Sequence, residues 1–86
     1  MIDDALIAML RCPENRSPLR RLESGALSRL NAGISAQQIR NRADQLVDRL
    51  LEDALVTEDG AVAYPVWEGI PMLLVDQGIP LQKGVF

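Results

Sequence analysis

One apolar stretch near the C-terminus, residues 64–74, most constrains what this chain can fold into. It reads Tyr-Pro-Val-Trp-Glu-Gly-Ile-Pro-Met-Leu-Leu. Proline cannot donate a hydrogen bond to a β-ladder, so it sits at strand edges or irregularities, whereas glycine permits a tight turn. The stretch therefore predicts the end of one strand, a turn at 68–69 and a second, wholly apolar strand over 70–75.

A β-hairpin is expected immediately before this stretch. Asp59 and Gly60 suit a two-residue type I′ turn, in which both central residues have positive φ. That turn pairs Leu55 with Tyr64 and Thr57 with Val62. Residues 55–75 are therefore expected to form a small antiparallel meander.

Three helices are expected before the meander. Residues 3–10 form a short one, with Leu6, Met9 and Leu10 on its inner face at helical spacing. A second runs over 25–33 and ends at Gly33, a candidate left-handed cap. Residues 36–52 form the longest, capped by Ser35, because apolar residues recur there every three or four positions. A break at 40–46 is the alternative, leaving a looser arm after a helix at 25–33.

The fold class is therefore α+β: a small antiparallel meander with a short N-terminal helix and a helical insertion between its two β halves. The 86 residues make one domain. The insertion covers about 24–54, and a C-terminal tail covers about 77–86. Ile79, Leu81 and Phe86 are expected to dock this tail on the domain.

The sequence offers no catalytic constellation. One cysteine and no histidine are present, so a thiol nucleophile has no imidazole base, and a structural zinc site has too few ligands. Cys12 is expected to be a small buried residue in a turn. No enzyme activity, metal or cofactor is predicted. No apolar run is long enough to span a membrane, and no signal peptide precedes the domain, which indicates a cytoplasmic protein.

The charges suggest a basic middle and an acidic C-terminal hairpin. Residues 52–76 carry six acids and no base. A net charge of −3 argues against binding nucleic acid without a partner. The candidate RNA contacts are the arginines of the first half: Arg16, Arg20, Arg21, Arg40 and Arg42.

Two motifs at opposite ends of the chain together carry a family resemblance. The first is Cys12-Pro13 followed by Pro18-Leu19, and the second runs from Ala63 through Leu74. They resemble the small zinc-ribbon activator subunit of tRNA, rRNA and protein methyltransferases, and are most similar to its short, uncharacterised bacterial relatives. The resemblance covers about 10–22 and 55–76, and its C-terminal motif is the more specific.

The resemblance implies a non-catalytic subunit that stabilises a methyltransferase by covering apolar surface and extending its β-sheet. It places the family's four zinc cysteines at Cys12, Asn15, Thr57 and Gly60, so the zinc site is degenerate and no zinc is expected. The expected partner-binding residues are Tyr64, Pro65, Trp67, Gly69, Ile70, Pro71, Met72 and Leu73. The alternatives are a self-associating domain, such as a homodimer, and an RNA-associated module that uses the Arg16–Arg49 cluster.

Overall fold

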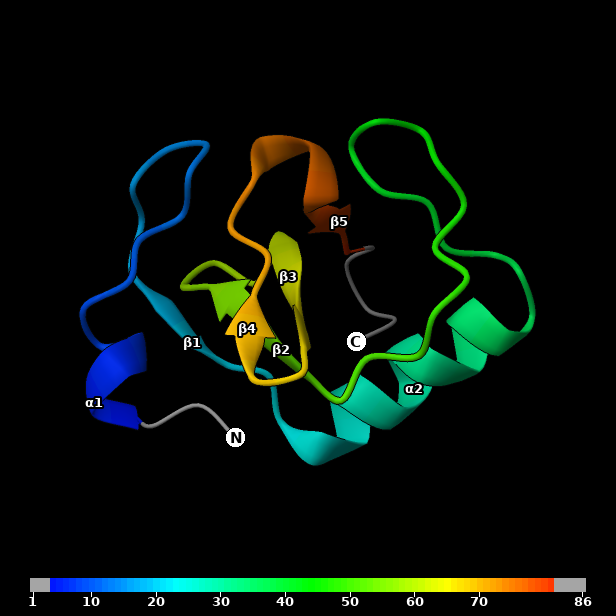
Figure 1. Ribbon diagram of the computed structural model, residues 1–86, viewed down its shortest axis with the longest axis horizontal. Coiled ribbons are helices and arrows are strands. Elements are labelled where there is room, and N and C mark those ends of the chain that lie inside the picture. Colours follow the sequence, from blue (N-terminus) through cyan, green and yellow to red (C-terminus); the bar gives the residue numbers. More distant parts are fainter. Residues whose placement is uncertain (1–3, 82–86) are drawn as a thin grey trace.

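The computed structural model of the chain describes residues 4–81 and has the predicted α+β class (Figure 1). An antiparallel sheet has the order β1-β2-β3-β4, and β5 pairs with β3 beside β4. One short helix, α1, lies beside β1, and a longer helix, α2, lies across one face of the sheet. The elements are α1 (Asp4–Ile7), β1 (Leu19–Arg21), α2 (Ser24–Ser35), β2 (Asp53–Thr57), β3 (Val62–Trp67), β4 (Ile70–Pro71), the 3-10 helix η1 (Val75–Gln77) and β5 (Ile79–Pro80).

The β2–β3 hairpin has the predicted register but a different turn. Leu55 pairs with Tyr64, as expected. Gly60 has a φ of 75°, whereas Asp59 lies outside the positive-φ region, so the predicted type I′ turn is wrong. Instead the Asp59 carboxylate accepts a hydrogen bond from the Thr57 hydroxyl, at 2.6 Å. This side-chain contact stabilises a longer loop in place of the two-residue turn.

The type I′ turn lies one hairpin later, between β3 and β4. Trp67 pairs with Ile70, and the intervening Glu68 and Gly69 have φ values of 56° and 74°. The expected strand over 70–75 is wrong in length, because β4 ends at Pro71. The chain then crosses through η1 to β5, which belongs to the sheet, so the first part of the expected tail is integral to the fold. Residues 82–86, including Phe86, lie outside the described residues.

Helix α2 continues past Gly33 to Ser35, and the reversal comes at Gln37, whose φ is 60°. The predicted helix over 36–52 is wrong, and the looser arm is what the structure has. Here the Asn41 side chain accepts backbone N–H groups of Ala43 and Gln45, at 3.0 and 3.1 Å. Such local bonds offer the backbone an alternative to the helical ladder.

The sheet separates two apolar clusters. On one face, α2 and residues 47–51 cover Ala54, Val56, Ala63 and Ile79. On the other, Ile7 and the 10–12 segment cover a cluster built around Leu55 and Tyr64. The predicted inner face at the N-terminal helix is wrong in part: Leu10 packs on this cluster, but Leu6 and Met9 are exposed and Ile7 is the buried residue.

Candidate functional site

The eight predicted partner-binding residues do not form one surface. Tyr64 and Pro65 are buried, and the Tyr64 side chain is thereby removed from direct partner contact. Trp67 and Leu73 are half-buried and pack on opposite faces of the sheet. The other members are Ile70, which is exposed, and Gly69, Pro71 and Met72, which are half-buried.

Tyr64 is held inside the fold by the single cysteine. Its hydroxyl lies 3.0 Å from the Cys12 sulfur, and both side chains are buried. Burial, and then the hydrogen bond to Cys12, raises the pKa of the Tyr64 phenol well above its ordinary value. In the described part of the chain, no group of three or more potential metal ligands occurs. The contact between Cys12 and Tyr64 links the 10–12 segment to β3 inside the cluster on one face of the sheet.

The predicted RNA-contacting arginines are mostly engaged with acids. Arg21 contacts Asp53 at 2.6 Å and Asp4 at 3.1 Å. Arg42 contacts Glu14 at 3.1 Å, and Arg40 lies 3.8 Å from Asp44. The two others, Arg16 and Arg20, are exposed. The arginines therefore form separate ion pairs, which partly neutralise the predicted basic region.

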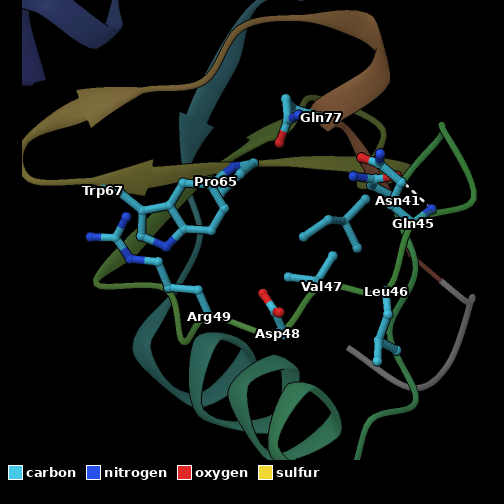
Figure 2. A pocket seen from close by; sticks show the side chains of 10 residues that line it. Asn41, Gln45, Leu46, Val47, Asp48, Arg49, Pro65, Trp67 and Gln77 are labelled. Atoms are coloured by element: carbon cyan, nitrogen blue, oxygen red, sulfur yellow. Dashed lines mark hydrogen bonds between the residues drawn. The ribbon is translucent and has the colours of Figure 1, made fainter.

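The structure contains a hollow that the sequence does not reveal, with a volume of about 170 Å3 (Figure 2). It lies between the 41–49 segment and β3, and residues of η1 and β5 close one side. Its lining residues are Asn41, Gln45, Leu46, Val47, Asp48, Arg49, Pro65, Trp67, Gln77 and Ile79. Of the predicted site residues, only Pro65 and Trp67 belong to it. The 41–49 residues were missed because their apolar spacing predicts a helix.

Trp67 is fixed at one end of the hollow. Its indole N–H donates to the Leu50 carbonyl at 3.0 Å. The Arg49 guanidinium lies over the ring, 5.2 Å from its centroid, and 3.9 Å from the Glu68 carboxylate. A cation at this distance from an indole face is attracted by the ring quadrupole. Figure 2 shows Arg49 and Trp67 side by side.

The irregular wall of the hollow is held by hydrogen bonds. The Asn31 side chain donates to the Leu51 carbonyl at 3.0 Å and accepts the Leu51 N–H at 2.8 Å. The Val47 N–H donates to the Ile39 carbonyl, and the Arg42 N–H to the Gly78 carbonyl, both at 2.9 Å. The wall thus has a defined position although it contains no regular element.

Exposed apolar side chains adjoin the hollow. Ile70 is the β4 partner of Trp67 and is 57% exposed, while Leu50 is 56% exposed. Leu46, in the lining itself, is 38% exposed. We call these three residues, Trp67 and the hollow the Trp67 surface. It offers apolar contact and hydrogen bonds, but the chain has no histidine to act there as a general base.

Comparison with known proteins places the chain in a family. No family model matches it. It is 31% identical over 84 residues to a UPF0434 protein of Vesicomyosocius okutanii subsp. Calyptogena okutanii (strain HA), a match that covers 98% of this chain and 93% of that protein. The chain belongs to the UPF0434 family. This family name carries no statement of an activity or a partner.

A solved structure supports the UPF0434 fold described above. The solution NMR structure of XF2673 from Xylella fastidiosa superposes with a TM-score of 0.77 at 30% identity. The match covers 98% of this chain and 88% of that chain. Within residues 4–81, no helix has the length and apolar character that a membrane crossing requires.

Proposed function

We propose that this UPF0434 protein is a non-catalytic subunit that binds a partner protein through the Trp67 surface. The observation that carries the proposal is the exposure of two apolar residues linked to the half-buried Trp67: Ile70, its strand partner, and Leu50, whose carbonyl accepts its indole N–H. Tryptophan is enriched among the residues that dominate binding energy, usually within a ring of neighbouring contacts that exclude water. The hollow beside it gives that surface a shape that a partner can recognise.

The contact proposed here is made by side chains and not by strand addition. β4 contains two residues, and Pro71 has no N–H to donate to an added strand. The Met72 N–H is already bonded to the Pro65 carbonyl at 2.8 Å. An edge this short, with a proline in it, is a poor template for another strand. The sheet extension implied by the family resemblance is therefore not part of the proposal.

The partner proposed is a methyltransferase. The basis is the resemblance of the Cys12-Pro13 and 63–74 motifs to the activator subunits of such enzymes. The residues assigned to the contact are Trp67, Ile70 and Leu50, with Leu46 at the hollow. The subunit would act by covering apolar surface of the enzyme, which removes that surface from water.

Affinity capture of the tagged protein from its own host tests this proposal. The wild type is expected to retain a methyltransferase in near-stoichiometric amount after a moderate-salt wash. Ile70→Glu and Leu50→Glu place a charge on the exposed contact and are expected to lose it. Ala32→Glu, on the exposed side of α2, is the matched control and should retain it. Capture of no protein, or equal capture by all variants, would refute the proposed surface.

A further inference from the structure

The size of the hollow limits what it can hold. Its volume of about 170 Å3 is close to the roughly 150 Å3 of an engineered cavity that binds benzene. One aromatic ring therefore fits, whereas a nucleotide or a helix does not. The occupant must be a single side chain or a fragment of similar size.

The buried part of the lining is apolar. Val47, Pro65 and Ile79 are all buried, and Trp67 closes one end. In Figure 2 the side chains of Val47, Pro65 and Trp67 lie below Gln77. Aromatic rings gain most from such a site, because they bury a large area with few rotatable bonds to immobilise.

The rim of the hollow supplies hydrogen-bonding groups that have no use within the fold. In the part of the chain that the structure describes, the side chains of Gln45, Asp48 and Gln77 make no hydrogen bond. Each of them carries an oxygen acceptor. An aromatic ring with one hydroxyl at its edge could donate a hydrogen bond to one of these oxygens. A purely apolar ring could not, so all three side chains would stay hydrogen-bonded to water.

The charges of the lining disfavour a phosphate and favour a hydroxyl donor. Arg49 lies over Trp67 and 3.9 Å from Glu68, so it is engaged there and does not pair with Asp48. A phosphate would meet the Asp48 carboxylate, and a second guanidinium would lie close to Arg49, whereas a hydroxyl can donate to Asp48 without adding a charge. We propose that the hollow receives one tyrosine side chain of the partner protein, an inference that rests on the function proposed above.

An NMR titration of the 15N-labelled full chain with N-acetyl-L-tyrosinamide tests this inference without the partner. Saturable shifts are expected at the Trp67 indole N–H and at the side-chain amides of Gln45 and Gln77. Loss of the hydroxyl in N-acetyl-L-phenylalaninamide should weaken binding by about threefold to tenfold, the range of one net hydrogen bond. N-acetyl-L-leucinamide should bind more weakly still.

Asp48→Ala should bring the affinity for the tyrosine amide down to that for the phenylalanine amide. Asp76→Ala removes an exposed acid outside the lining and should leave both affinities unchanged. The inference is overturned if no shift saturates, if the leucine amide binds equally well, or if N-acetyl-L-argininamide or adenosine binds more tightly at the same resonances.

The two proposals fail in distinguishable ways. Capture of a methyltransferase without saturable binding of the tyrosine amide overturns only the inference that a tyrosine occupies the hollow. Binding of the tyrosine amide without capture of any protein overturns the proposed function, and with it the origin of the tyrosine in a partner.

Discussion

At the scale of single residues, the contact between Cys12 and Tyr64 joins two segments that are distant in the sequence. They are 52 positions apart, and their hydrogen bond lies in the cluster on one face of the sheet. The sequence predicts correctly that Cys12 is buried. It places Tyr64 among the partner-binding residues, because neither spacing nor polarity shows that its hydroxyl has a buried partner.

The strength of this contact can be measured with a double-mutant cycle. Cys12→Ala leaves the buried Tyr64 hydroxyl without a partner and should lower the free energy of unfolding by about 1–3 kcal/mol. In a Tyr64→Phe background, Cys12→Ala should lower the free energy of unfolding by less than it does in the wild type. The expected difference between the two losses is about 0.5–1.5 kcal/mol. Urea denaturation of the four proteins checks this expectation. Additive losses would show that the two side chains do not interact.

The phenol of Tyr64 also predicts a dependence of stability on pH. Its pKa is raised in the folded protein, mainly by burial, so the unfolded chain loses this proton first as the pH rises. The stabilising contribution is thus complete below a pH of about 10 and is lost progressively above it. Urea midpoints between pH 8 and pH 11 should fall more steeply for the wild type than for Tyr64→Phe. Parallel curves would contradict the assignment.

At the scale of elements, the β3–β4 turn contains strain that can be relieved. Glu68 has a φ of 56°, a conformation that costs a residue with a side chain about 1 kcal/mol or more. Asparagine tolerates it and is preferred in type I′ turns, so Glu68→Asn should stabilise the protein by about 0.5–1 kcal/mol.

Asp59→Gly in the other hairpin is the matched control for this turn. Asp59 has no positive φ to relieve, and its carboxylate accepts hydrogen bonds from Thr57 and Ala61. Thermal unfolding should therefore show a lower midpoint for Asp59→Gly and a higher one for Glu68→Asn. A shift in the same direction for both variants would argue against the two turn types assigned here.

The 36–52 segment depends on α2 for its position. Asn31→Ala would leave the N–H and C=O of Leu51 without their partner and should lower the free energy of unfolding by about 1–3 kcal/mol. Ser28→Ala, on the exposed side of the same helix, should change it by less than about 0.5 kcal/mol. Urea denaturation compares the two. Equal effects would mean that the hydrogen bonds between the Asn31 side chain and the Leu51 backbone do not hold the segment.

The elements also show how far the sequence determines the fold. The register of the β2–β3 hairpin was predicted because a short loop between two apolar runs fixes it locally. The conformation of the 36–52 segment was not predicted correctly. Its apolar spacing suggests one buried helical face, but Val47 and Leu51 are buried while Leu46 and Leu50 are exposed. The path of this segment is instead set by the Asn31 contacts from α2 and by the local Asn41 hydrogen bonds, neither of which is visible in a periodic pattern.

At the scale of the whole molecule, the Trp67 surface assembles three segments that are distant in sequence. Residues of the 41–49 segment line the hollow together with Pro65 and Trp67 of β3 and with Gln77 and Ile79. The sequence indicated Trp67 and Ile70 as contact residues. It could not indicate the hollow beside them, because a helix over 36–52 would have removed its irregular wall altogether.

The central claim, that a partner protein contacts the Trp67 surface, is tested most directly by photo-crosslinking in the host cell. Benzoylphenylalanine at position 70 lies on this surface, and at position 32 it lies on the exposed side of α2. We predict a discrete crosslinked product containing a methyltransferase from position 70 and none from position 32. No product from position 70, or the same product from both positions, would contradict the claim.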